Sequence, residues 1–266
     1  MILQCQKESY NTLVDFAKKS CHSICIEGSQ GSGKTHLAKE YAKLLKIPDF
    51  HIISPKTEAI RDIVSSANST QFPIVFCIEN LDDGVMSASS AILKFLEEPS
   101  VNTYIIITCR NIYHIPDTIV SRSLCVTLSN PHIEDINKLA DSIDRSKYEY
   151  LSKTNLWKCI NNLSDVKTVM DLSPEQIGYF DTATQTLLDN KLSVSDIIWR
   201  IGHYPDNKPT PIIFLLQYAM YNTDNPFIRN FILQALNELH NQRLASHLVL
   251  AKLVMDIQFL SERRVH

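Results

Sequence analysis

Hydrophobic residues in the first half of the chain follow two alternating spacings. Short apolar runs without polar alternation, typical of buried strands, are separated by stretches with an apolar residue every three or four positions, typical of helices. We predict strands at 23–27, 51–54, 74–78 and 104–108, and helices at 9–20, 35–45, 57–68 and 87–97. Strands that alternate with helices form a parallel sheet with helices on both faces. The first half therefore predicts an α/β fold.

The pattern changes at Pro131, because from there onward the apolar residues keep a helical spacing almost throughout. Pro174 and the polar stretch 202–210 are candidate helix breaks, whereas Asn225-Pro226 is typical of an N-cap followed by proline at the first helical position. We expect an α/β core at 1–130, a small helical lid at 131–180 and a helical collar module at 181–266.

The composition is that of a globular protein with nearly balanced charge. Of the 266 residues, 44% are hydrophobic and 21% are charged, and the formal net charge is −3 at pH 7. This balance excludes the highly charged, weakly hydrophobic composition of disordered chains. Because the overall charge does not favour nucleic acid, a DNA partner would have to be bound by local groups such as helix N-termini and a few Lys or Arg side chains, or by an assembly.

The cysteines and the N-terminus favour a reducing compartment. Seven cysteines are scattered along the chain, several of them inside apolar runs. We expect them to be reduced core thiols. Cys21 and Cys25 are close in sequence, but no second pair follows at zinc-ligand spacing. Since the sequence contains neither a signal-peptide core nor an apolar run of about 18 residues, we expect a cytoplasmic protein without a membrane partner.

The strongest motif is G-x-x-x-x-G-K-T, which lies between the first predicted strand and the next helix. Its residues are Gly28, Ser29, Gln30, Gly31, Ser32, Gly33, Lys34 and Thr35. In this context the glycines let backbone N–H groups cradle a β-phosphate, Lys34 can reach the β- and γ-phosphates, and the Thr35 hydroxyl can ligate Mg²⁺. The motif predicts binding of ATP with Mg²⁺.

A P-loop site also needs acidic groups at the end of a later strand, and here the pattern is incomplete. The apolar run 74–78 ends in Glu79-Asn80. Glu79 can stand at the metal, but the amide of Asn80 cannot accept a proton from water as a carboxylate does. Asp82 and Asp83 lie just beyond, either as a substitute for that carboxylate or as a helix cap. The sequence therefore predicts nucleotide binding more firmly than hydrolysis.

Three further segments carry a resemblance to a known family. They are Ser-Ala-Ile-Leu-Lys-Phe-Leu-Glu-Glu-Pro at 90–99, Tyr-Ile-Ile-Ile-Thr at 104–108 and Ile-Pro-Asp-Thr-Ile-Val-Ser-Arg-Ser at 115–123. Together with the P-loop they resemble the AAA+ sliding-clamp loader subunits: the bacterial polymerase III gamma/tau and delta-prime subunits, the small subunits of replication factor C, and phage loader subunits. The cysteine-rich zinc insertion of the bacterial subunits is missing, which suggests a compact, phage-type or minimal loader.

The resemblance implies roles for individual residues. Arg122 matches the arginine finger, which acts in trans on ATP bound to a neighbouring subunit; the alternative is a surface arginine. Thr108 matches the sensor-1 position, with Asn111 as a fallback. Lys167 stands where the family has its sensor-2 arginine, and it keeps the charge but loses the bidentate fork. A solvent-facing lysine is the alternative reading for that position.

The function implied by the resemblance is that of an ATPase subunit of a clamp loader. Such a subunit joins others in an oligomer, expected to be a pentameric ring, and helps load the sliding clamp onto primer-template DNA without reading its sequence. The alternative is an ATP-binding structural subunit, similar to delta-prime, that hydrolyses little. A P-loop nucleoside kinase fits neither the helical second half nor the Ser-Arg-Ser motif. The expected location is the cytoplasm of a bacterium or of a phage-infected cell.

Overall fold

The computed structural model describes residues 1–67, 71–84, 92–93, 96–97, 101–188, 192–205, 211–240 and 245–262. The chain forms two compact units: the first comprises Met1–Ser142 with Asn162–Val166, and the second comprises Ile143–Asn161 with Lys167–His266. Among the described residues, no helix is both long and apolar enough to span a membrane. The predicted boundaries at 131 and 181 remain predictions.

The first unit is built on a parallel sheet with the strand order β2-β3-β4-β1-β5. The strands are β1 (Ser23–Glu27), β2 (Phe50–Ile53), β3 (Ile74–Ile78), β4 (Thr103–Cys109) and β5 (Leu124–Thr127). Helix α1 (Lys7–Lys18) precedes β1, and the helices between the strands are α2 (Lys34–Leu44), α3 (Thr57–Ala67) and α5 (Asp117–Val120). Short 3₁₀ helices are η1 (Gln4–Gln6), η2 (Leu81–Asp83) and η3 (Ile112–His114).

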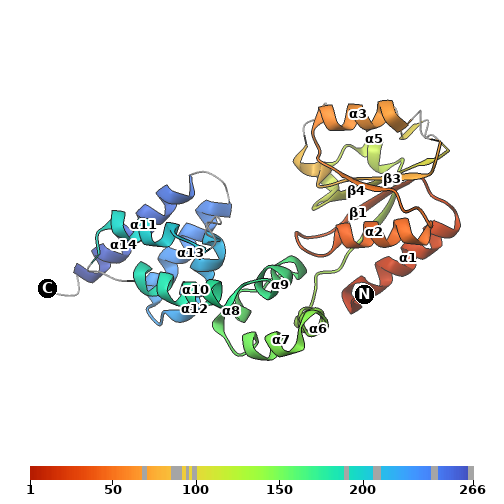
Figure 1. Ribbon diagram of the computed structural model, residues 1–266. Helices are drawn as coiled ribbons and strands as arrows, with labels where there is room; N and C mark the ends of the chain where they lie inside the picture. The colour runs from red at the N-terminus through yellow and green to blue at the C-terminus, as the bar shows by residue number, and fades with distance from the viewer. Residues whose placement is uncertain are drawn as a thin grey trace. The chain divides into compact units, whose positions relative to one another are not determined.

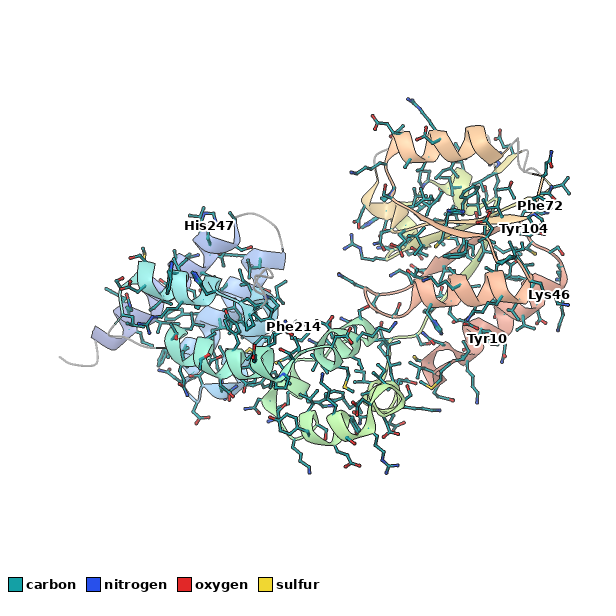
Figure 2. The ribbon with its side chains drawn as sticks, viewed as in Figure 1. Tyr10, Lys46, Phe72, Tyr104, Phe214 and His247 are labelled. Atoms are coloured by element: carbon teal, nitrogen blue, oxygen red, sulfur yellow. The ribbon has the colours of Figure 1, made fainter. Side chains whose placement is uncertain are left out.

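Helices cover both faces of this sheet, as the alternating pattern predicts (Figure 1). On one face Leu13 of α1 and Tyr41 of α2 pack with strand residues, and Tyr10 and Tyr104 lie against the same cluster (Figure 2). On the other face Ile60 of α3 and Ile119 of α5 are buried against the sheet. The apolar runs thus supply two cores, one on each side of the strands.

Two strands differ from the sequence prediction. The apolar run at 51–54 predicts a buried strand, but β2 is an edge strand in which Ile52 is 48% exposed. β5 was not predicted at all. It is the other edge strand, it is short, and only Val126 among its residues is buried, so its sequence does not show the continuous apolar run of a central strand.

The chain after Pro131 is helical in all its described regular structure, as the apolar spacing predicts. The helices are α6 (Ile133–Ile143), α7 (Arg145–Leu151), α8 (Asn155–Lys158), α9 (Leu163–Met170), α10 (Pro174–Leu187), α11 (Val194–Gly202), α12 (Ile212–Asn222), α13 (Pro226–His240) and α14 (Ser246–Glu262). Pro174 is the first residue of α10, and the Ser173 hydroxyl accepts from the Gln176 N–H in a capping box. The Asn225 carboxamide caps α13, because it accepts from the Phe227 N–H at 3.0 Å.

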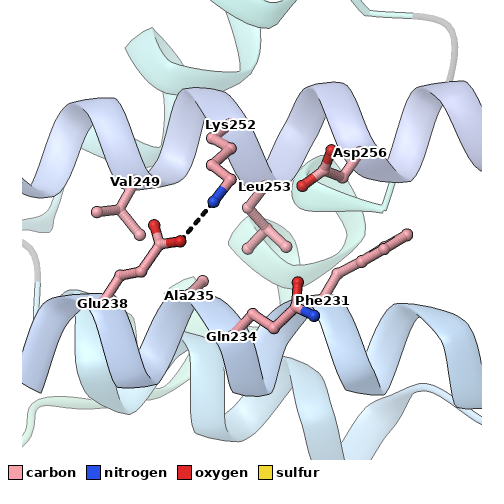
Figure 3. Close-up of a pocket in the computed structure, with 8 residues that line it drawn as sticks. All are labelled: Phe231, Gln234, Ala235, Glu238, Val249, Lys252, Leu253 and Asp256. Atoms are coloured by element: carbon pink, nitrogen blue, oxygen red, sulfur yellow. Dashed lines mark hydrogen bonds and ion pairs between the residues drawn. The ribbon is translucent and has the colours of Figure 1, made fainter.

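The last two helices pack side by side in the second unit. An ion pair joins Lys252 of α14 to Glu238 of α13 beside a cavity of about 10 Å³ (Figure 3). The second carboxylate oxygen of Glu238 is buried and makes no hydrogen bond within the described part of the chain. A cavity of this size next to a polar atom has room for about one water molecule.

Candidate nucleotide-binding site

The P-loop connects the end of β1 to the start of α2. Gly31 and Gly33 have φ angles of +71° and +96°, a region that only glycine enters at low cost. At Gly28 an added Cβ would lie 2.8 Å from the Ser32 Oγ. The backbone conformation therefore favours glycine at 31 and 33, a side chain at 28 would displace the Ser32 hydroxyl, and the loop ends at the helix N-terminus as an anion cradle requires.

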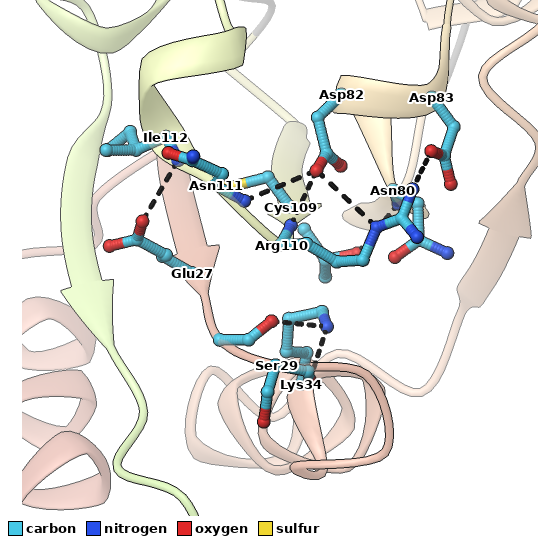
Figure 4. A network of polar contacts seen from close by, with 12 residues as sticks. Glu27, Ser29, Lys34, Asn80, Asp82, Asp83, Cys109, Arg110, Asn111 and Ile112 are labelled. Carbon is cyan, nitrogen blue, oxygen red and sulfur yellow. Dashed lines mark hydrogen bonds and ion pairs between the residues drawn. The ribbon is translucent and has the colours of Figure 1, made fainter. Parts of the chain in front are cut away.

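Lys34 points its ammonium group back into this loop. Its Nζ donates to the backbone oxygens of Gly28 at 2.8 Å and Ser29 at 2.9 Å (Figure 4). Burial lowers the pKa of the Lys34 ammonium, and the charge of Arg110 lowers it further, whereas the negative charge of Asp82 acts in the opposite direction. Because neutral carbonyls are its hydrogen-bond partners in the loop, this buried cation can exchange them for phosphate oxygens.

Thr35 and Glu79 form the metal-binding part of the predicted site. The Thr35 Oγ1 donates to the Glu79 Oε1 at 2.5 Å, which joins the first turn of α2 to the end of β3. A hydroxyl and a carboxylate are oxygen ligands of the kind that Mg²⁺ takes beside phosphates. The buried Ser32 Oγ has no hydrogen-bond partner among the residues that the structure describes. The residues present therefore fit a nucleotide with Mg²⁺.

Asn80 and Thr108 meet beside Glu79, at the carboxyl ends of β3 and β4. The Asn80 N–H donates to the Thr108 Oγ1 at 3.0 Å, and the Thr108 side chain is buried. Asn80 has a φ of +48° and a ψ of +58°, a left-handed conformation that asparagine tolerates better than most residues. The backbone thus gives a physical reason for asparagine at a position where a catalytic carboxylate is expected.

Asp82 and Asp83 both contact the residues that follow β4, whereas the start of the predicted helix at 87–97, which they were expected to cap, lies outside the described residues. The Asp82 Oδ2 accepts from the backbone N–H groups of Arg110 at 2.9 Å and Asn111 at 3.3 Å, and its side chain is 3% exposed (Figure 4). Asp83 forms an ion pair with the Arg110 guanidinium. The carboxamide of Asn111 accepts from the Tyr113 N–H, so it caps η3. Asp82 holds the loop after β4 through its Oδ2, whereas its buried Oδ1 has no hydrogen-bond partner among the described residues, so Asp82 still offers one carboxylate oxygen as a substitute for the missing group.

Two contacts to the P-loop were missed by the sequence analysis. The buried Gln6 side chain donates from Nε2 to the Ser32 carbonyl at 3.2 Å. From the start of α9, the Leu163 N–H donates to the Gly31 carbonyl at 3.0 Å, within the first unit. No motif marks either residue, because an isolated polar or apolar side chain carries no signal of a partner more than 20 positions away.

Arg122 and Lys167 are both on the surface. The Arg122 Nη2 lies 3.0 Å from the Glu97 Oε1, and its Nη1 donates to the Thr118 carbonyl at 3.0 Å. Its side chain is 38% exposed. Lys167 is exposed on α9. Of the segment 90–99, only Ile92, Leu93, Leu96 and Glu97 are among the described residues.

A larger cavity in the second unit has different chemistry. It measures about 440 Å³, and aromatic and aliphatic residues dominate its lining, including Phe180, Tyr204 and Phe214. Among the described lining residues the charged one is Asp171, whose carboxylate would repel phosphate. The P-loop, with Lys34 and the Thr35–Glu79 pair, is therefore the better candidate for a nucleotide.

Comparison with known proteins finds similarity to subunits of DNA polymerase III. The family model described as DNA polymerase III, delta subunit, matches residues 45–132. The DNA polymerase III subunit delta' of Bacillus subtilis (strain 168) is 25% identical over 137 residues, which are 40% of this chain and 41% of that protein. The match thus spans about two fifths of the relative's length.

Similar solved structures extend over nearly the whole chain. A DNA polymerase III gamma subunit-related protein from Thermotoga maritima superposes with a TM-score of 0.60 at 16% identity, covering 94% of this chain and 98% of that one. A RuvB point mutant from Thermotoga maritima gives a TM-score of 0.51 at 12% identity, covering 89% of this chain and 83% of the other. The chain therefore has the AAA+ fold with a helical C-terminal part, and it resembles the clamp-loader subunits of DNA polymerase III.

Proposed function

We propose that this chain is an ATP-dependent subunit of a DNA-polymerase clamp loader. In this role it joins partner subunits in a ring, expected to be pentameric, and helps place the sliding clamp on primer-template DNA. The observation that carries the proposal is the P-loop with buried Lys34 beside the Thr35–Glu79 pair, on a parallel sheet with the strand order β2-β3-β4-β1-β5. Contact with DNA would be independent of sequence and sensitive to salt.

The residues of the site would act in the following way. Lys34 would leave the Gly28 and Ser29 carbonyls for the β- and γ-phosphate oxygens of ATP. Thr35 and Glu79 would hold Mg²⁺, which neutralises charge on the phosphates when it is bound. Thr108 would act as a positioning residue, because its hydroxyl fixes the backbone at Asn80.

Two surface cations would couple the site to its surroundings. Arg122 would be offered in trans to ATP on the neighbouring subunit, and it would exchange Glu97 for the γ-phosphate when the neighbour docks. Lys167, on α9, would serve in place of the family's sensor-2 arginine, with its charge but without its bidentate fork. Hydrolysis would then depend on assembly.

A second candidate function is that of an ATP-binding structural subunit, similar to delta-prime, that supplies Arg122 but hydrolyses little. The observation that favours it is Asn80, whose amide can orient a water molecule but cannot take its proton. In that case the motor activity would belong to neighbouring subunits.

Steady-state ATP turnover tests these two functions. The purified chain is measured alone and with its candidate partner subunits, the clamp and primed DNA, beside Lys34→Ala and Arg122→Ala. Lys43→Ala and Arg145→Ala are matched controls, because Lys43 is exposed on the same helix as Lys34 and Arg145 pairs on the surface with Glu149. A thermal melt of each variant checks that it is folded.

The outcomes separate the functions. Turnover that rises with clamp and DNA, and that falls to background in both site variants but in neither control, supports the loader ATPase. Binding of ATP with turnover at the Lys34→Ala background under every condition supports the structural subunit. A wild-type chain that binds no nucleotide contradicts both.

A further inference from the structure

Arg110 lies beside the P-loop but has no part in the roles described above. It follows β4 directly, and the last residue of that strand, Cys109, accepts the Gly28 N–H with its carbonyl at 3.1 Å. The register pairs Cys109 with Glu27, the residue before the P-loop. The backbone of Arg110 is therefore fixed within one residue of a direct contact to the loop.

The side chain of Arg110 is held by acidic neighbours on the same rim of the sheet. Its guanidinium pairs with Asp83, and its Nε lies 3.7 Å from the Asp82 Oδ2 (Figure 4). Asp82 is almost completely buried and also binds two backbone N–H groups of the loop, whereas Asp83 and Arg110 are each 46% exposed. The backbone is thus anchored firmly, while the guanidinium is held by a half-exposed pair with Asp83 and by a longer contact with Asp82.

The terminal phosphate of a bound nucleotide would lie on this side of the loop. A P-loop surrounds the β-phosphate, and its lysine reaches on to the γ-phosphate. Here that direction is marked by Lys34 and by the Thr35–Glu79 pair, which lie toward the ends of β3 and β4 rather than toward β5. The charges of Asp82 and Arg110 act on the Lys34 ammonium, which agrees with this arrangement.

We propose that Arg110 is a specificity-determining residue that exchanges Asp83 for the γ-phosphate of a nucleotide bound to the same chain. This inference rests on the proposed nucleotide binding and adds a cis-acting group to it. An exposed ion pair between a guanidinium and a carboxylate contributes little free energy to stability. A guanidinium can bind a phosphate more favourably, through two parallel hydrogen bonds. The diphosphate lacks the group that Arg110 would bind, so the exchange distinguishes ATP from ADP.

Isothermal titration with ADP and with a non-hydrolysable ATP analogue, both with Mg²⁺, tests the inference. We expect Arg110→Ala to lower the affinity for the ATP analogue about tenfold and to leave the affinity for ADP nearly unchanged. A tenfold loss corresponds to one charge-assisted hydrogen bond of moderate strength. Asp83→Asn should raise the affinity for the ATP analogue about threefold, because it releases the Arg110 guanidinium from its ion pair. In the Arg110→Ala background the same Asp83 change should have no effect.

Two controls match the charge changes. Arg61→Ala removes an exposed positive charge from α3 of the same unit, and Asp49→Asn removes an exposed carboxylate from the residue before β2, at the other end of the strands. Neither should change the ratio of the two affinities. Equal weakening of both ligands in Arg110→Ala, or no weakening, would overturn the inference, as would an Asp83→Asn effect that persists without Arg110. If wild type binds neither ligand, the proposed function fails together with the inference.

Discussion

Replacing Gly31 with alanine tests how the start of α9 is fastened to the P-loop. Gly31 has a φ of +71°, and an added Cβ would lie 2.1 Å from the Asn162 Oδ1. Alanine in this left-handed conformation costs about 1–2 kcal/mol relative to glycine. Asn162 must also move, and its oxygen then loses bonds from the N–H groups of Ser164 at 2.9 Å and Asp165 at 3.0 Å. Loss of that cap costs about 1 kcal/mol.

The two costs predict a particular double-mutant cycle. Gly31→Ala should lower the free energy of unfolding by about 2–3 kcal/mol and Asn162→Ala by about 1 kcal/mol. Because Gly31→Ala already displaces the cap, the double variant should also lose only about 2–3 kcal/mol, so the coupling is about 1 kcal/mol. Urea unfolding followed by far-UV circular dichroism measures all four proteins. Losses that simply add would show that Asn162 does not lie against Gly31, and the reasoning would be refuted.

Three further outcomes can be measured separately. Glu97→Gln should change the free energy of unfolding by less than about 1 kcal/mol, because its pair with Arg122 is exposed, and should raise ATP turnover of the assembled complex by up to about fivefold; a fall to the Arg122→Ala level would contradict the exchange. Asn225→Ala should cost about 1 kcal/mol in urea unfolding through loss of the α13 cap, and no measurable loss would refute the cap. A thiol reagent should modify Cys125 first and Cys21 more slowly in the folded chain, and the five buried thiols only after unfolding; rapid reaction of all seven would contradict the burial.

The sequence pattern predicted the central strands and the P-loop, because both are determined by residues close together in the sequence. The central strands were found because each is a continuous apolar run, and the P-loop was found because its glycines have a fixed spacing. β5 was missed because a short edge strand needs few apolar residues. The contact of Gln6 with Ser32 was missed because nothing in the neighbourhood of Gln6 depends on that partner.

Lys34, Arg110 and Arg122 share one feature that relates the fold to the proposed chemistry. Each cation has a partner in its own chain: Lys34 has loop carbonyls, Arg110 has Asp83 and Arg122 has Glu97. A phosphate must displace these partners, so part of its binding free energy is spent on the exchange. The cost differs between ATP and ADP, because only a γ-phosphate would meet all three groups: Lys34 and Arg110 of the same chain and Arg122 of the neighbouring chain. A site arranged in this way would bind ATP less tightly than one with free cations, but each cation would return to its own partner once the γ-phosphate is lost, so the change from ATP to ADP would become a change of side-chain contacts that an ATP-driven assembly can use.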